Sequence, residues 1–176
     1  MLCTSALAQQ IPQPPAADAS TPEAALRSYW ALKDWYEAAW RMERVERKSD
    51  ALFERLVAEL TRGKPQRFYE GLAAYRRMDV GARLERKIAS MRQESPERVV
   101  IEANIRNVSP VPAGVQSTAF LQKLRDAGEN YRYVIAREGE RWHILEIWNL
   151  WTGVMAPKEQ YDTPPQQLFP AHVPSQ

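Results

Sequence analysis

Residues 131–148 read YRYVIAREGERWHILEIW, in which two runs rich in aromatic and β-branched residues flank Glu138-Gly139. Such residues fit a pleated, half-buried surface, and a glycine between two such runs is typical of a β-hairpin. If Glu138 and Gly139 form a two-residue turn, Tyr131 lies opposite Glu146 across the hairpin. The sequence therefore predicts an antiparallel pair of strands at the end of the folded domain.

The two faces of this hairpin differ in character. Side chains alternate along a strand, so one face is expected to carry aromatic and aliphatic groups with a single carboxylate among them. The residues of this face are Tyr131, Tyr133, Ile135, Trp142, Ile144, Glu146 and Trp148. The opposite face includes His143 and becomes basic near the turn. A three-residue loop would change the pairing, so the register depends on the turn.

The chain upstream of the hairpin begins with helical patterns. Thr21-Pro22-Glu23 offers an N-cap, a proline at the first helical position and an acidic residue in the first turn. Aromatic and aliphatic side chains then recur at helical spacing, which predicts a helix that lies across a sheet. Ser49-Asp50 either caps a second helix or interrupts one long helix that continues to about Arg62. A third helix is expected at residues 66–78.

After Gly81 the spacing of the apolar residues changes from a helical period to the alternation typical of a strand. Residues 97–108 alternate as a strand does, and residues 83–93 are expected to form a strand before it, with a turn at Ser95-Pro96; a helix is the alternative for residues 83–93. A short helix is expected at residues 117–126, ended by Gly128. Helices followed by an antiparallel sheet give an α+β fold class, with N-terminal helices packed on the sheet.

Both ends of the chain differ in composition from the domain expected at residues 22–151. Residues 1–8 resemble the remnant of a signal peptide that begins upstream, because Ala6-Leu7-Ala8 is a small-x-small cleavage pattern. Residues 9–21 are expected to be a disordered linker and residues 152–176 a Pro-rich flexible tail. We therefore expect a periplasmic or secreted protein.

Composition narrows the classes of function. The 176 residues suit one domain, and 26% charged residues with a net charge of +2 suggest neither disorder nor a nucleic-acid partner. No apolar run is long enough for a transmembrane span. The only cysteine, Cys3, lies in the expected signal remnant and follows Leu2, which makes lipidation the less favoured interpretation. With two histidines and no phosphate-binding loop, we expect no metal and no cofactor.

Three segments of the chain resemble the nuclear transport factor two-like, or cystatin-like, superfamily. They are the helix start at Thr21-Pro22-Glu23, the strand at residues 97–108 and the closing hairpin of residues 131–147. This resemblance implies a curved antiparallel sheet wrapped around a long helix, which makes a cone with a pocket. The superfamily contains isomerases, cyclases and dehydratases as well as non-enzymatic binding and assembly domains, so the fold alone does not decide the function.

Within such a cone, the aromatic face of the hairpin would line the pocket. The expected lining residues are Trp30, Tyr133, Trp142, Ile144 and Trp148. Glu146 and Tyr131 are the candidate catalytic pair, because a carboxylate beside a phenol can act as a general base with an orienting donor. A structural hydrogen bond at a sheet edge is the favoured interpretation of the same pair.

Three functions remain open on the sequence. The favoured one is a non-enzymatic, exported binding or assembly module for a small apolar ligand or an envelope protein. The second is a small cofactor-independent isomerase, cyclase or hydratase that uses the pocket carboxylate. The third is a structural subunit of an envelope or secretion complex. A homodimer formed through the sheet is compatible with each of them.

Overall fold

The computed structural model describes residues 12–43, 48–62, 83–111, 114, 118–150 and 166–169. The helices are α1 (Pro22–Glu43), α2 (Lys48–Leu60) and α3 (Ala119–Ala127). The strands are β1 (Leu84–Ser95), β2 (Arg98–Asn107), β3 (Glu129–Glu138), β4 (Arg141–Leu150) and β5 (Gln166–Phe169). The predicted α+β class is confirmed, with the described helices α1 and α2 ahead of an antiparallel sheet. The expected signal remnant at residues 1–8 and the expected helix at residues 66–78 lie outside the described residues.

Helix α1 begins as the sequence predicts. The Thr21 hydroxyl accepts a hydrogen bond from the backbone nitrogen of Ala24 at 3.0 Å, and the Thr21 carbonyl accepts one from Ala25. An N-cap of this kind satisfies donors that the first helical turn leaves unpaired. Helix α2 begins at Lys48, and its Phe53 ring stacks on Tyr36 of α1 with 4.2 Å between the ring centroids. The two helices therefore pack against each other through aromatic side chains.

The five strands form one sheet in the order β1-β2-β3-β4-β5, and every neighbouring pair is antiparallel. Residues 83–93, which fit either a strand or a helix, lie almost entirely within β1, and the turn to β2 is at Pro96-Glu97. Strand β5 comes from the part of the chain that the sequence predicts to be a Pro-rich flexible tail. Its residues pair with Ile147, Trp148 and Asn149 of β4.

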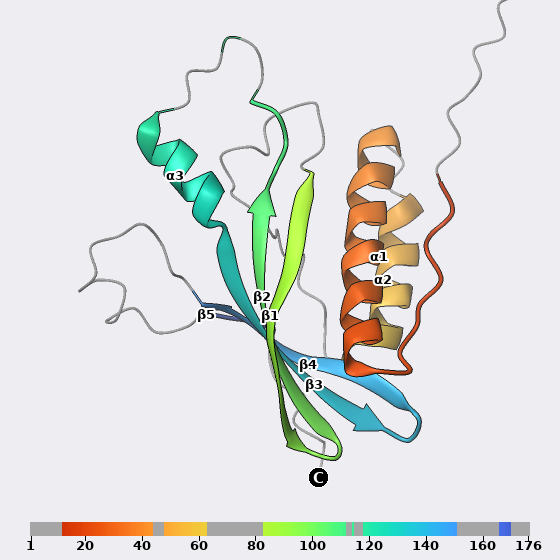
Figure 1. Cartoon of the computed structure of the whole chain (residues 1–176). Coiled ribbons are helices and arrows are strands. Elements are labelled where there is room, and N and C mark those ends of the chain that lie inside the picture. The colour runs from red at the N-terminus through yellow and green to blue at the C-terminus, as the bar shows by residue number, and fades with distance from the viewer. Residues whose placement is uncertain are drawn as a thin grey trace, which may run out of the picture.

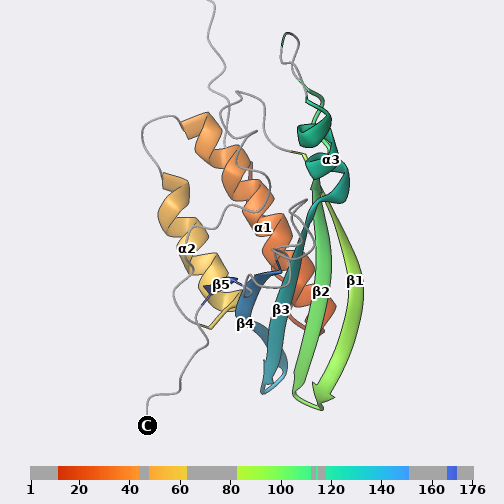
Figure 2. The same ribbon diagram turned by 90° about the vertical axis from the view of Figure 1, so that its left-hand side faces the viewer.

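Helices α1 and α2 lie on one face of the sheet, which we call the inner face; the opposite one is the outer face (Figures 1 and 2). Helix α3 lies at the end of the sheet from which β3 starts, and it makes its strand contacts with β2. The hydrophobic core sits between the inner face and α1 and α2. Its fully buried large side chains include Leu26, Val57, Leu60, Ile101, Ile105, Tyr131, Tyr133, Ile135, Ile144 and Ile147. The closed cone that the resemblance implies stays a prediction.

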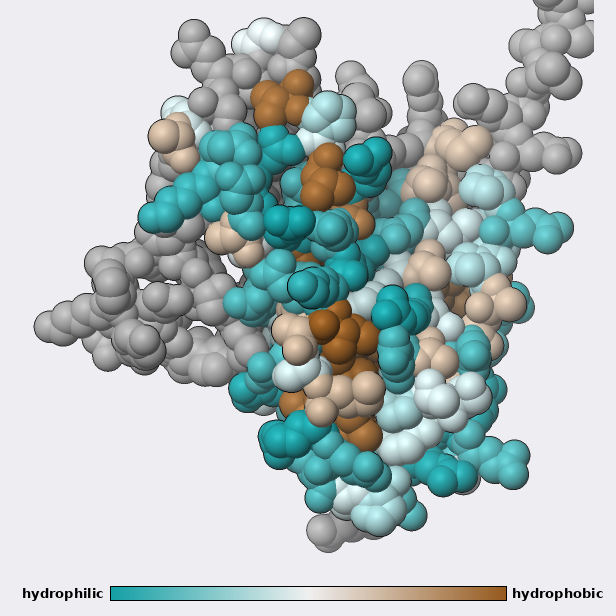
Figure 3. Space-filling model, in the orientation of Figure 1, coloured by the Kyte–Doolittle hydropathy of each residue, from teal (hydrophilic) through white to brown (hydrophobic). Residues whose placement is uncertain are grey.

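Strand β1 is joined to α1 by an ion pair. The guanidinium of Arg86 holds both carboxylate oxygens of Asp34, at 2.6 and 2.8 Å, and lies 5.9 Å from the centre of the Trp30 ring. Leu84 and Ile88, on either side of Arg86, are half-buried against the core. Figure 3 shows apolar atoms in a strip down the middle of the view, bordered on the left by hydrophilic side chains. The bidentate contact between Arg86 and Asp34 therefore fixes strand β1 to α1, next to apolar side chains that are partly covered.

The segment before α1, where the sequence predicts a linker, makes hydrogen bonds with the domain. The indole nitrogen of Trp35 donates a hydrogen bond to the carbonyl of Pro12 at 2.7 Å. The backbone nitrogen of Trp142 donates one to the carbonyl of Ala19 at 2.9 Å, and Ala19 is part of the core. These contacts give the segment buried polar partners and apolar contact, which its proline-rich composition alone did not indicate.

Candidate functional site

The aromatic side chains expected to line a pocket are packed against α1. Trp30 is 4% exposed, Tyr133 is fully buried, and their rings meet edge to face with centroids 5.9 Å apart. The Trp30 indole nitrogen donates a hydrogen bond to the Tyr133 hydroxyl at 3.1 Å. Trp142 and Ile144 are buried in the same core. The structure therefore brings four of the five expected lining residues together on the inner face, as core.

The fifth expected lining residue, Trp148, and the candidate base Glu146 lie on the outer face. The turn residues are Gly139 and Glu140, rather than Glu138 and Gly139, and β4 contains a bulge at Leu145. Beyond the bulge Glu146 pairs with Val134, and Tyr131 pairs with Asn149. The predicted pairing of Tyr131 with Glu146 is therefore wrong.

The bulge is the physical reason for this correction. Moving the turn by one residue shifts each pairing by two positions, which keeps Trp142 and Ile144 on the predicted face. One additional residue at position 145 then reverses the alternation for the rest of β4. Ile147 takes the inner position instead, where it is buried opposite Tyr133.

The carboxylate that Tyr131 contacts is Glu129. The Tyr131 hydroxyl donates a hydrogen bond to Glu129 Oε2 at 2.5 Å, and the Tyr131 ring lies 6.3 Å from that of Tyr133. Tyr131 is 1% exposed, whereas Glu129 is half-buried at the start of β3. The sequence carried a signal for this pair, because residues two apart on a strand share a face. A phenol beside a carboxylate can position a proton, as expected for Glu146.

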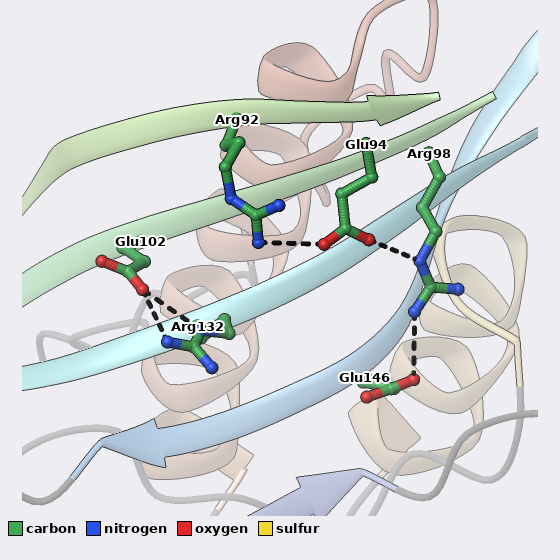
Figure 4. Close-up of polar contacts among 6 residues, drawn as sticks. All are labelled: Arg92, Glu94, Arg98, Glu102, Arg132 and Glu146. Atoms are coloured by element: carbon green, nitrogen blue, oxygen red, sulfur yellow. Dashed lines mark hydrogen bonds and ion pairs between the residues drawn. The ribbon is translucent and has the colours of Figure 1, made fainter. Parts of the chain in front are cut away.

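Glu146 is held instead by a chain of ion pairs that crosses the outer face (Figure 4). Arg92 contacts Glu94 at 2.9 Å, Glu94 accepts a hydrogen bond from Arg98 at 2.9 Å, and Arg98 lies 3.6 Å from Glu146. The Trp148 indole nitrogen donates a hydrogen bond to the other oxygen of Glu146 at 2.7 Å. The Glu146 side chain is only 16% exposed, so its two oxygens have two different donors beside them. We call Arg92, Glu94, Arg98 and Glu146 the outer-face chain.

Further charge pairs continue the same layer across the sheet. Arg132 donates to one oxygen of Glu102 through Nε and Nη2, at 3.1 and 2.9 Å, and Arg106 pairs with Glu85. The charged side chains surround two valines, Val100 and Val134, which are each 5% exposed and lie outside the main core. The pKa of Glu94 is lowered, first by its hydrogen bond with Arg98 and further by Arg92. The arrangement places opposite charges beside each other on neighbouring strands.

A third polar group lies where α2 meets β4. Residues 61 and 62 run beside the edge of β4, with the backbone nitrogen of Arg62 donating to the carbonyl of Ile144 at 3.0 Å. Arg62 Nη2 lies 2.9 Å from His143 Nε2, and Arg62 Nε donates to Glu138 at 2.7 Å. Because a guanidinium only donates, His143 Nε2 accepts and the ring is neutral. His143 lies on the face opposite the aromatic one, as predicted.

Burial lowers the pKa of His143, and the positive charges of Arg62 and Arg141 lower it further. The carboxylate of Glu138 and the backbone at Glu59 act in the opposite direction. His143 is 4% exposed, so the loss of hydration disfavours the imidazolium. A neutral imidazole could accept a proton, but the guanidinium already occupies its accepting nitrogen. The group therefore acts first as a connection between α2 and the β3-β4 hairpin.

No three histidine, cysteine, aspartate or glutamate side chains among the described residues gather closely enough to hold a metal ion. None of the described helices has the length and apolar content that a membrane crossing requires.

Comparison of the chain with protein-family models, with curated proteins and with solved structures finds no match in any of the three. The resemblance to the nuclear transport factor two-like superfamily therefore stays a prediction from sequence. The α+β arrangement, with a helix-covered inner face and a charged outer face, is a finding of the structure itself.

Proposed function

We propose that this chain is a non-enzymatic, exported binding or assembly module that engages an envelope protein through the outer face of its sheet. The observation that carries the proposal is the outer-face chain, which links β1, β2 and β4 (Figure 4). It lies on the face of the sheet opposite to α1 and α2 (Figure 2). Trp148 lies beside it, in contact with Glu146. Arginine and tryptophan are both enriched at the energetically important positions of protein interfaces.

The packing of the inner face favours the outer face as the binding surface. Trp30, Tyr133, Trp142 and Ile144 are each at most 8% exposed and belong to the same core. A small apolar ligand in that place would have to separate α1 from the sheet. A partner on the outer face leaves the core as it is.

The charge pattern indicates the chemistry of the partner. Arginines and carboxylates alternate across the outer face, with Arg106, Arg98 and Arg132 each beside a glutamate. A polyanion would meet as many repelling groups as attracting ones. A folded protein surface with both signs of charge can match the pattern, and charge matching of this kind sets specificity and orientation.

The export part of the proposal rests on the sequence. Ala6-Leu7-Ala8 has the cleavage pattern of a signal peptide, and a chain that starts at Gln9 has no cysteine to oxidise. A partner in the bacterial envelope is the class of protein that such a module would meet. N-terminal sequencing of the native protein from a periplasmic fraction tests this part, and a retained Met1 in the cytosol would contradict it.

The binding surface is tested by reversing one charge in the outer-face chain. Arg98→Glu places a third carboxylate between Glu94 and Glu146, and like charges in an interface cost several kcal/mol. We expect capture of the envelope partner by the tagged full-length chain to fall about tenfold or more, as measured by quantitative mass spectrometry of the captured proteins.

Arg27→Glu is the matched control, because Arg27 also pairs with a glutamate, Glu23, on the exposed side of α1. Capture of the partner should be unchanged in this variant. Equal capture by the unaltered chain and Arg98→Glu would contradict the proposal, provided that denaturation shows both to be folded. Surface ion pairs contribute only about 0–1 kcal/mol to stability, so both variants are expected to fold.

A homodimer through the sheet is a specific form of this proposal. Sedimentation velocity of the purified chain measures it directly. If the chain self-associates, and Arg98→Glu abolishes the association while Arg27→Glu does not, the partner is a second copy. If the chain is a monomer, the partner is a different protein.

The contact between Tyr131 and Glu129 favours a second candidate, a cofactor-independent isomerase or hydratase. Glu129 would serve as the base and Tyr131 as its orienting donor, since their oxygen atoms are 2.5 Å apart. Such a base exchanges the proton next to a substrate carbonyl with solvent. Deuterium incorporation from heavy water into a panel of small ketones and acids tests this. Incorporation that Glu129→Gln abolishes supports the candidate, and no incorporation above buffer contradicts it.

A further inference from the structure

The segment of residues 12–20 lies extended along α1, and its chain direction is opposite to that of the helix (Figure 1). Pro12, Pro14 and Pro15 restrict this segment and the residues before each proline to extended or polyproline II backbone. Pro14 and Pro15 are half-buried. A proline-rich stretch is therefore already seated on a helix face.

Two side chains of α1 hold the backbone of this segment. Trp35, which is 7% exposed, donates its indole hydrogen to the carbonyl of Pro12 at 2.7 Å. The Ser28 hydroxyl accepts a hydrogen bond from the backbone nitrogen of Asp18 at 2.8 Å and donates one to the Asp18 carbonyl at 3.0 Å. Ser28 and Trp35 are seven positions apart, about two helical turns, so they lie on one stripe of α1. The hydrogen bonds of Ser28 and Trp35 are to main-chain atoms, so they do not depend on which side chains the segment carries.

The hydrogen bond from Trp35 to the Pro12 carbonyl matches one part of the general way in which proteins bind proline-rich peptides. An aromatic side chain packs against the prolines and donates a hydrogen bond to a carbonyl of the peptide, whose backbone is ordered in advance. We propose that the face of α1 around Trp35 is a recognition site for a proline-rich segment of a partner protein. Residues 12–20 of this chain are its resident ligand, and the partner segment binds by displacing them.

The two ends of the resident segment are held differently. At its end nearest α1, Ala19 is in the core and its carbonyl bonds to Trp142 of β4. Toward its start, the indole of Trp35 holds it through the carbonyl of Pro12. The part that carries the prolines can therefore be exchanged while Ala19 stays in place. This surface is on the helical side of the domain, away from the outer face, so it extends the proposed function.

The test uses the full-length chain and a fluorescent synthetic peptide that has the sequence of residues 9–20. Replacing Pro12, Pro14 and Pro15 of the chain by alanine loosens the resident segment, because each such change restores backbone freedom to the unbound segment. Fluorescence anisotropy should show the peptide binding the loosened chain about tenfold more tightly than the unaltered chain, in which the tethered segment competes at high effective concentration.

Two further measurements make the result specific. Trp35→Phe in the loosened chain keeps an aromatic ring but removes the indole donor, and should weaken peptide binding about fivefold, the effect of losing a typical hydrogen bond. A peptide with alanine at the three prolines should bind at least about fivefold more weakly than the proline peptide. Ser28→Ala offers a second way to loosen the segment if the proline variant does not fold.

Equal affinity of the peptide for the unaltered and the loosened chain overturns the proposal, as does absence of saturable binding to both. Binding that does not depend on Trp35 also overturns it. Capture of the envelope partner, tested with Arg98→Glu, and binding of the proline peptide are independent measurements. Either proposal can therefore fail while the other holds.

Discussion

The indole nitrogen of Trp30 lies 3.1 Å from the hydroxyl oxygen of Tyr133 and donates a hydrogen bond to it inside the core. This bond joins α1 to β3, over a sequence separation of 103 residues. The rings meet edge to face, the arrangement that aromatic pairs prefer, which adds about 0.5–1.5 kcal/mol to the burial itself. The contact therefore fixes where the helix crosses the sheet.

Truncation of Trp30 should be among the most damaging changes in the chain. Trp30→Ala is expected to lower the free energy of unfolding by roughly 3–5 kcal/mol, the usual cost of truncating a buried large aromatic side chain. Urea denaturation followed by far-ultraviolet circular dichroism measures the loss. Trp148→Ala is the matched control, because the same change is made at a half-buried outer-face position, and should cost clearly less. Equal losses would mean that the two faces are assigned wrongly.

Replacing Tyr133 by phenylalanine isolates the hydrogen bond from the packing. Tyr133→Phe leaves the buried indole hydrogen of Trp30 without its hydroxyl acceptor, and a buried unsatisfied donor costs about 1–3 kcal/mol. The free energy of unfolding should therefore fall by that amount, while the loss after Trp30→Ala should be smaller in the Tyr133→Phe background than in the unaltered chain. Simple addition of the two losses would show that the side chains are not coupled.

Glycine is required at position 128 for two reasons. Its φ is +69°, and a Cβ atom there would lie 2.6 Å from Arg106 Cγ and 2.7 Å from the Ile105 carbonyl. Gly139 has a similar φ of +61° with no atom within 4 Å of its Cβ position. Gly139→Ala should cost about 1–2 kcal/mol for the left-handed backbone alone. Gly128→Ala should cost about 1–3 kcal/mol more because of overpacking, and equal losses in thermal or urea denaturation would contradict the close approach.

His143 should make stability depend on pH. Its folded pKa is lowered from an ordinary value of 6.5, so the unfolded chain takes up this proton at a higher pH than the folded chain does. Stability is then complete above about pH 6.5 and declines as the pH falls toward the folded pKa, where the decline ends. Urea midpoints measured between about pH 5 and 8 should show this slope. His143→Gln should remove it, and an unchanged slope in that variant would assign the dependence to other groups.

Glu146→Gln should weaken the fold slightly. The glutamine oxygen can still accept the hydrogen bond of Trp148, but the charge opposite Arg98 is lost. The expected loss in free energy of unfolding is about 0.2–1 kcal/mol, in the range of exposed ion pairs. A carboxylate buried among aromatic rings would give the opposite sign, because burial disfavours its charged form. A gain in stability at neutral pH would therefore indicate that Glu146 lies on the inner face and would contradict its placement on the outer face.

Most of the secondary structure follows from local patterns in the sequence. Thr21-Pro22-Glu23 placed the start of α1 correctly because a helix N-terminus is specified by its own residues. Alternation in residues 97–108 identified β2 for the same kind of reason. The segment of β1 was ambiguous because its residues from Ala89 to Ser95 are exposed, and exposed positions carry no apolar period.

The candidate site could not be placed from the sequence because it depends on one additional residue in β4. Alternation assigns Trp142 and Ile144 to the inner face correctly, and nothing in the residue types around Leu145 indicates where the alternation reverses. The partner of Tyr131 was accessible, since Glu129 is two residues away on the same strand. The ion pairs of Arg98 with Glu146 and of Arg132 with Glu102 depend on register between strands distant in sequence, so they became visible only in the structure.

The bulge at Leu145 gives β4 two halves that serve different parts of the molecule. Before it, Trp142 and Ile144 belong to the core; after it, Glu146 and Trp148 belong to the outer face. If the bulge closed while Leu145 stayed in the chain, strict alternation would exchange interior and surface for the rest of the strand. In the evolution or engineering of this chain, a change that removes the bulge but keeps the residue is therefore more consequential than most substitutions in β4. A library that varies the outer face has to leave the bulge in place.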